Sequence, residues 1–194
     1  MQDIEKRDRD TSSTSSGEAQ VAFPIPADHE PPSYTYPVPA AQVPPSGHRV
    51  QLGVFPGINI TREAPFTDAD GKSPVFLGSA ILEDGSVHPC KIAPSLLGAP
   101  CRVPFGGGEL EHYGRYDLLP FVPELMEFVV TSRGHVPPGR QPVKGGSESG
   151  HELYHGVAVI DGVKVPGKAG FHLGGCNVPF GGREHVVTEK YEIL

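Results

Sequence analysis

The stretch Val103-Pro104-Phe105-Gly106-Gly107-Gly108-Glu109 recurs 75 residues later as Val178-Pro179-Phe180-Gly181-Gly182-Arg183-Glu184. Two consecutive glycines between β-prone residues predict a turn with positive φ angles, or a close backbone approach that no side chain would permit. A shared Val-Pro-Phe-Gly-Gly could still arise by chance, so the residues around it decide whether the chain is duplicated.

The flanking residues match in the same order along the chain. One short insertion separates the upstream matches, and each glutamate lies seven residues before a tyrosine. The matched pairs are Cys101 with Cys176, Tyr116–Leu119 with Tyr191–Leu194, and Pro89-Cys90-Lys91 with Pro166-Gly167-Lys168. The chain therefore contains a duplicated unit, and a site in one copy predicts a counterpart in the other.

Each copy also contains a hairpin signal. Val75–Leu82 is followed by Glu83-Asp84-Gly85, and Leu153–Ile160 is followed by Asp161-Gly162. Asp-Gly between two β-prone runs is a strong hairpin signal. We expect a two-residue turn in the second copy and a bulged or longer loop in the first, which has one extra residue.

The sequence predicts an all-β fold made of two tandem repeats, residues 48–122 and 123–194. Val50–Phe55 and Met126–Thr131 are the expected opening strands of the two copies, and helices have little support. A unit of this size buries too little surface to be stable alone, so we expect the copies to share one core. Short antiparallel strands rich in Gly and Pro suggest a pseudo-twofold sandwich or a prism-like architecture.

Residues 1–47 differ in composition from the rest. The first 20 are charged and rich in Ser and Thr, and residues 21–47 contain eight prolines. Such a segment predicts a disordered leader followed by an extended, polyproline-like stretch. Tyr34 and Tyr36 could form a docking peptide for a partner protein, or the leader could be an inert spacer.

Composition excludes several classes of protein. The net charge is −7, and no basic stripe is present to neutralise phosphates, which argues against a nucleic-acid partner. No apolar run is long enough to span a bilayer, and the N-terminus lacks the apolar stretch of a signal peptide. Three cysteines indicate reduced thiols, and Cys101 and Cys176 are expected to be small buried side chains. We therefore expect a cytoplasmic protein without direct membrane insertion, which leaves secretion by a non-standard route open.

Signatures of catalysis and of metal binding are missing. No Gly-x-Ser-x-Gly elbow or phosphate loop is present, so we expect neither an enzyme nor a cofactor. His151 and His155 have helical ligand spacing, but they fall in a stretch predicted to be loop and strand, so no metal site is expected. Glu109 and Glu184 are more simply explained as turn-stabilising carboxylates that accept backbone N–H bonds.

The combination of Pro-Gly-Lys, Val-Pro-Phe-Gly-Gly-Arg-Glu-His and a closing Tyr-Glu-Ile-Leu resembles the DM-nine repeat family. Copy two matches closely from Gly156 to Leu194, and copy one matches more loosely from Gly78 to Leu119. The resemblance implies an all-β fold of two repeats, and it allows strands to be exchanged between them. It also implies a mannose-binding lectin of the kind that acts in innate recognition, whereas other relatives are fused to pore-forming modules.

The resemblance further implies that the sugar is bound by the lysine of Pro-Gly-Lys and by an acidic residue before the first hairpin strand. In this chain the lysines are Lys168 and, through Pro-Cys-Lys, Lys91. The corresponding acids are Asp68 and Glu148, the latter one residue out of register. Secondary candidates are Asp70, Glu109 and Glu184.

The residue types suit a sugar ligand. A carboxylate accepts hydrogen bonds from two adjacent hydroxyls while an ammonium donates to their oxygens. The alternative is an ordinary surface ion pair of little consequence. The sequence thus predicts a non-catalytic, mannose-type carbohydrate-binding protein, for which a homodimer is one way to present several sites. The rival hypotheses are a protein-interaction scaffold that uses the leader, and the recognition part of a pore-forming defence system.

Overall fold

The computed structural model describes residues 44–52 and 63–194, and within these ranges every regular element is a β-strand. The all-β prediction is therefore confirmed. No helix capable of crossing a membrane occurs among these residues. The strands are β1 (Val50–Leu52), β2 (Phe66–Thr67), β3 (Pro74–Ile81), β4 (Val87–Ile92), β5 (Cys101–Phe105), β6 (Gly108–His112), β7 (Tyr116–Leu119), β8 (Val129–Thr131), β9 (Lys144–Glu148), β10 (His151–Ile160), β11 (Val163–Gly170), β12 (Gly175–Phe180), β13 (Arg183–Val187) and β14 (Tyr191–Ile193).

The duplication in the sequence is a duplication of strand pairing. Copy one comprises β3–β7 and copy two comprises β10–β14, each an antiparallel series in which the first strand also pairs with the last. Gly78 pairs with Cys90 as Gly156 pairs with Gly167. The expected opening strands are present in shortened form as β1, which pairs with β7, and β8, which pairs with β14. The second begins at Val129 and not at Met126, because Met126 is held in a turn by a hydrogen bond from its N–H to the Val122 carbonyl. Residues 53–55 of the first predicted strand lie outside the described residues.

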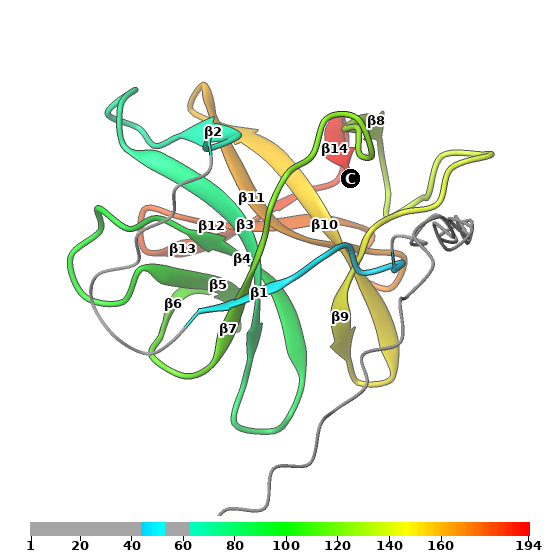
Figure 1. Ribbon diagram of the computed structural model, residues 1–194. Helices are drawn as coiled ribbons and strands as arrows, with labels where there is room; N and C mark the ends of the chain where they lie inside the picture. Colours follow the sequence, from blue (N-terminus) through cyan, green and yellow to red (C-terminus); the bar gives the residue numbers. More distant parts are fainter. Residues whose placement is uncertain (1–43, 53–62) are drawn as a thin grey trace, which may run out of the picture. The chain divides into compact units, whose positions relative to one another are not determined.

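The two copies join into a closed barrel (Figure 1). The ring runs β4-β5-β6-β13-β12-β11-β10-β9 and returns to β4, with every neighbouring pair antiparallel. Each junction between the copies is a single bridge, Arg183 with Gly108 at one end and Val87 with Ser147 at the other. Closure gives every strand of the ring two neighbours and explains why the sheet does not form a two-layered sandwich.

The turns follow their residue types. Asp161 and Gly162 have φ angles of 51° and 82° and connect the paired residues Ile160 and Val163, the geometry of a two-residue type I′ hairpin. The corresponding loop in copy one is longer, as expected from its extra residue, and runs between the paired Ile81 and Val87.

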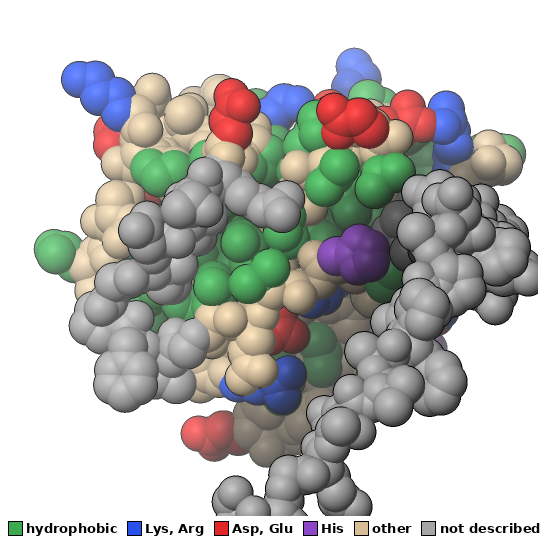
Figure 2. All heavy atoms as spheres, viewed as in Figure 1, with side chains coloured by type: hydrophobic (Ala, Val, Ile, Leu, Met, Phe, Trp, Pro, Cys, Tyr) green, Lys and Arg blue, Asp and Glu red, His purple; other side chains and the backbone are tan. Residues whose placement is uncertain are grey.

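The hydrophobic core consists of three clusters. One lies in each copy, and the third is shared between them. The shared cluster contains Phe66, Val75, Leu77, Ala93, Leu119, Val157 and Leu194. Cys101 and Cys176 are fully buried in the clusters of their own copies, as predicted, and their thiols are free. On the face shown in Figure 2, hydrophobic side chains gather at the centre and acidic and basic side chains alternate along the upper rim.

The segment before β1 is bonded to both copies. The Pro45 carbonyl accepts the Lys144 N–H at 2.9 Å. Arg49 donates to the Ser79 hydroxyl at 2.7 Å and lies 2.9 Å from Nε2 of the buried His155. Burial, followed by the charge of Arg49, lowers the pKa of His155 well below its usual value. His155 is thus a neutral core residue. The predicted leader up to residue 43, with Tyr34 and Tyr36, lies outside the described residues.

Candidate functional site

The two repeat lysines occupy equivalent positions on equivalent strands. Lys91 on β4 pairs with Leu77, and Lys168 on β11 pairs with His155. Both lysines are only 3% exposed. A buried ammonium needs hydrogen-bonding or charged partners, because desolvation without them is costly. The partners of these two lysines therefore define the site.

Each lysine has a glutamate of its own copy within ion-pair distance. Lys91 Nζ lies 3.0 Å from Glu109 Oε1, and Lys168 Nζ lies 4.0 Å from Glu184 Oε1. Glu109 is on β6 and Glu184 is on β13, the strands that follow the two Gly-Gly turns. These two strands are neighbours in the barrel. The secondary candidates Glu109 and Glu184 are therefore placed beside the lysines.

The same glutamates also link the two copies through hydrogen bonds. Glu109 Oε2 accepts the Gly182 N–H at 2.8 Å, and Glu184 Oε2 accepts the Gly107 N–H at 2.7 Å. The prediction that these carboxylates accept backbone N–H bonds at a turn is confirmed, but the turn belongs to the other copy. The reciprocity follows from the β6–β13 junction, which brings the two Gly-Gly turns side by side.

A phenylalanine from the opposite copy completes each lysine site. Lys91 Nζ lies 5.8 Å from the centroid of the Phe180 ring, and Lys168 Nζ lies 5.6 Å from that of Phe105. These separations are within the range of cation–π attraction. Sequence reasoning treated Val-Pro-Phe-Gly-Gly only as a turn and missed its phenylalanine. The sequence did contain a signal for this role, because the phenylalanine recurs in both copies next to a glycine turn, where a side chain need not be buried.

The predicted acids also occupy equivalent positions. Phe66 pairs with Val75 and Gly146 pairs with Leu153, so Asp68 and Glu148 each lie two residues beyond a matched pair. The apparent shift of Glu148 in the sequence arises because the loop after Asp68 is two residues longer than the loop after Glu148. When the two copies are aligned by strand pairing, Asp68 and Glu148 therefore occupy equivalent positions.

In copy one, a pocket of about 480 Å³ brings the candidates together. Asp68, Asp70, Lys91 and Glu109 line it with Phe180 of copy two. Asp68 is half-buried and accepts the N–H of Ala69 at 2.9 Å. Among the described ion pairs, Lys91 bonds only to Glu109, so its ammonium retains donors for a ligand. We name Asp68, Lys91, Glu109 and Phe180 the copy-one site.

Asp70 has a different role from Asp68. Its carboxylate accepts the hydroxyl and the N–H of Ser73 and the N–H of Lys72, all within its own loop. These hydrogen bonds lower the pKa of Asp70 to about 2, and the one from the Ser73 hydroxyl has the largest effect. Asp70 therefore fixes the loop that presents Asp68.

In copy two, the acid and the lysine are directly paired. Glu148 Oε2 lies 2.9 Å from Lys168 Nζ, and Glu148 Oε1 lies 2.9 Å from His172 Nε2. Burial alone would raise the pKa of Glu148, but hydrogen bonds from Lys168 and His172 outweigh it and hold the pKa below its usual value. We name Glu148, Lys168, Glu184 and Phe105 the copy-two site.

A fully buried histidine distinguishes the copy-two site. His88 Nδ1 lies 3.4 Å from Lys168 Nζ and 3.5 Å from Glu148 Oε2, and its Nε2 lies 2.8 Å from the Ser86 hydroxyl. Burial and the Lys168 ammonium both lower the pKa of His88. Copy two has Val165 at the strand position that corresponds to His88, so Lys91 has no equivalent histidine partner.

Acidification is expected to weaken the copy-two site. Because the pKa of Glu148 is lower in the folded state, its contribution to stability is complete above the ordinary glutamate pKa of about 4.3 and is lost as pH falls through the folded value. Chemical denaturation between pH 7 and pH 3 should show a steeper loss for the wild type than for Glu148→Gln. Parallel curves for the two proteins would contradict the assignment.

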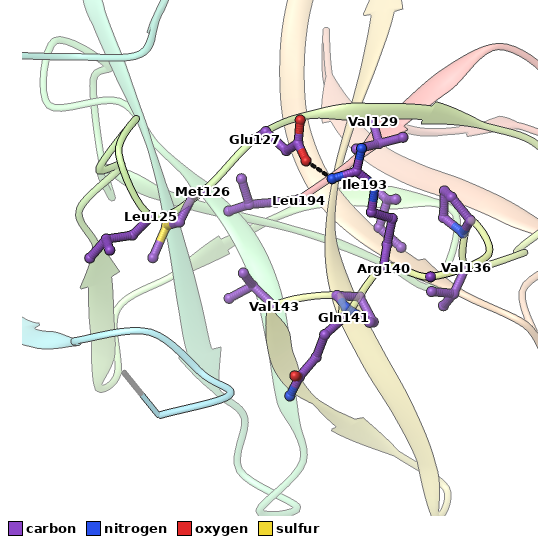
Figure 3. Close-up of a pocket in the computed structure, with 13 residues that line it drawn as sticks. Leu125, Met126, Glu127, Val129, Val136, Arg140, Gln141, Val143, Ile193 and Leu194 are labelled. Carbon is purple, nitrogen blue, oxygen red and sulfur yellow. Dashed lines mark hydrogen bonds and ion pairs between the residues drawn. The ribbon is translucent and has the colours of Figure 1, made fainter. Parts of the chain in front are cut away.

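A further pocket, of about 240 Å³, lies between residues 125–143 and the C-terminal strand (Figure 3). Its lining is mainly aliphatic, and its charged residues, Glu127 and Arg140, are bonded to each other. Hydroxyl-rich ligands need unpaired polar groups, so this pocket suits a sugar less well than the copy-one site. No set of three or more metal-ligating side chains converges anywhere in residues 44–52 and 63–194.

Comparisons with known proteins agree with the repeat architecture. Among solved structures, the chain is similar to the nematode sperm cell motility protein MFP2B, with a TM-score of 0.53 and 14% sequence identity. The similarity covers 75% of this chain and 44% of that chain, so this chain spans less than half of that protein, and the likeness concerns the fold. No curated protein matches. The DM9 repeat model matches residues 68–187, which is more than half of the chain and includes most of both copies. The chain therefore belongs to the DM9 repeat family.

Proposed function

We propose that this protein is a non-catalytic carbohydrate-binding protein of the mannose type, with the copy-one site as its principal binding site. Membership in the DM9 repeat family supports a lectin-like or binding module. The observation that carries the proposal is the convergence of Asp68, Lys91, Glu109 and Phe180 on one pocket. A carboxylate, an ammonium and an aromatic ring are the groups that bind vicinal hydroxyls and the apolar face of a pyranose.

The roles follow from the geometry. Asp68 accepts hydrogen bonds from two adjacent hydroxyls, and Lys91 donates to their oxygens. Glu109 holds the Lys91 ammonium in place, because it is fixed in turn by the N–H of Gly182. The Phe180 ring offers a face for the C–H groups of the sugar. The arrangement is pre-organised, which lowers the entropic cost of binding.

The copy-two site has the same kinds of residue, but their hydrogen-bonding groups already bond to one another and to neighbouring histidines. Glu148 and Lys168 already bond to each other, and His88 and His172 take further bonding positions. A sugar bound there adds to an existing network. One shallow site binds weakly, so multivalent presentation, through both copies or through a homodimer, raises avidity toward a glycan surface.

Binding is tested by calorimetric titration with methyl α-mannoside and mannan. The wild type should bind both, and Asp68→Asn should weaken binding by about tenfold or more, since a hydrogen bond to a charged group contributes about 1.5–3 kcal/mol. Lys91→Ala should also lose binding. Glu189→Gln is the matched control, because Glu189 is an exposed acid bonded to Arg133. Flat wild-type titrations with both ligands would overturn the proposal.

A further inference from the structure

The copies are bridged at β9–β4 but not at the equivalent pair, β2–β11, which lies beside the closed ring because β2 is not one of its strands. We call the unbridged gap between β2 and β11 the open seam. In copy two, β9 reaches across to copy one, where Ser147 bridges to Val87 of β4. Strand register places Thr67 of β2 and Lys164 of β11 at the positions of Ser147 and Val87. In the described residues β2 pairs only with β3, and β11 pairs with β12 only from Lys168 onward. Among the strands that the structure describes, none pairs with the first half of β11 on its edge toward β2.

The difference between the seams has a cause in the sequence. Gly146 lets β9 approach β4 so closely that a Cβ at this position would lie 2.0 Å from the Val87 carbonyl oxygen. The equivalent residue of β2 is Phe66, whose side chain packs in the shared core. A backbone approach of this kind requires glycine, so Phe66 keeps the second seam open.

The open seam is a pocket of about 580 Å³, a size typical of small-molecule sites. Its walls come from residues 64–71 of copy one and residues 161–164 of copy two. Figure 1 shows β2 and the turn between β10 and β11 side by side at this end of the barrel. Asp68 and Ala69 line both this pocket and the copy-one site, so the two spaces meet at Asp68.

The lining suits a polar, hydroxyl-rich ligand. Asp161 and Thr67 are exposed, and the Lys164 side chain is 49% exposed and bonds to Glu192 at 2.7 Å. The first half of β11 adds edge backbone groups that no other strand of residues 44–52 and 63–194 pairs with, and such groups require hydrogen-bonding partners.

We propose that the open seam between β2 and β11 is a second saccharide subsite, continuous with the copy-one site through Asp68. The ligand class is an oligosaccharide of at least two pyranose units rather than a single sugar. One unit lies against Lys91 and Phe180, and the next lies between Thr67, Asp161 and Lys164. The loop that separates the two subsites is held rigid by Asp70, which keeps Asp68 available to both units. The inference rests on the proposed function and specifies its ligand.

The test compares ligands of different length on the same protein. Methyl α-mannoside fills one subsite, and mannotriose is long enough to fill both. The wild type should bind mannotriose about tenfold more tightly, the equivalent of one further good hydrogen bond. The double variant Asp161→Asn/Lys164→Ala should bind the two ligands with affinities within about twofold of each other, while its affinity for methyl α-mannoside stays unchanged. Asparagine tolerates the positive φ of position 161.

The control is Lys144→Ala, since Lys144 is also an exposed lysine bonded to a glutamate but lies outside the open seam. This variant should keep the wild-type preference for mannotriose. Equal wild-type affinities for the two ligands would overturn the subsite and leave the proposed function intact. Loss of both affinities in the double variant would also overturn it, because the residues would then act on the first subsite. Absence of binding by either ligand would overturn the proposed function and this inference with it.

Discussion

Replacement of Lys168 by alanine is expected to lower the free energy of unfolding by about 3–5 kcal/mol, the usual cost of removing one partner from a buried ion pair. The Lys168 side chain is 4% exposed and lies 2.9 Å from Glu148 and 4.0 Å from Glu184. Its removal leaves two largely buried carboxylates without their cation. The measurement is equilibrium denaturation in urea at pH 7.

The matched control is Lys164→Ala on the same strand. Lys164 also bonds to a glutamate, but its side chain is half exposed, so the change should cost about 0–1 kcal/mol. A second variant separates charge from packing. In Lys168→Met the volume is retained, and adding Glu148→Gln should recover part of the loss because one unpaired charge is removed. Equal costs for Lys168→Ala and Lys164→Ala would show that the copy-two network contributes little to stability.

The features predicted from the sequence are those that depend on local pattern. The Asp161-Gly162 turn, the strand character of both copies and the burial of Cys101 and Cys176 each follow from residue type and spacing. The alignment of the copies also located Lys91 and Lys168, because the repeat fixes equivalent positions without any knowledge of the fold. Most of the strands can therefore be predicted from local residue patterns and from the internal repeat.

The rest depends on contacts between the copies, which a local pattern does not encode. Glu109 and Glu184 were placed at a turn correctly, but only the β6–β13 junction shows that each binds the turn of the other copy. Phe105 and Phe180 reach a lysine for the same reason. The offset of Glu148 from Asp68 is likewise a matter of loop length, which strand pairing resolves and residue counting does not.

Replacement of Gly146 by alanine is expected to lower the free energy of unfolding by about 3 kcal/mol or more. Two costs combine at this position. The φ angle of 150° is one that L-residues rarely adopt, and such strain costs about 1–3 kcal/mol. The new Cβ would also lie 2.0 Å from the Val87 carbonyl oxygen, and relief of the clash would separate β9 from β4. Thermal or urea denaturation measures the loss.

Gly150→Ala isolates the first cost, because Gly150 lies in the same β9–β10 hairpin at a φ of 79°, and no atom lies within 4 Å of the place that its new methyl group would occupy. Backbone strain alone predicts a loss of about 1 kcal/mol there. The excess at Gly146 then measures the closure of the barrel at Val87 and Ser147. If the two alanine variants lost the same stability, the closed seam would contribute nothing, and the contrast with the open seam held apart by Phe66 would lose its physical basis.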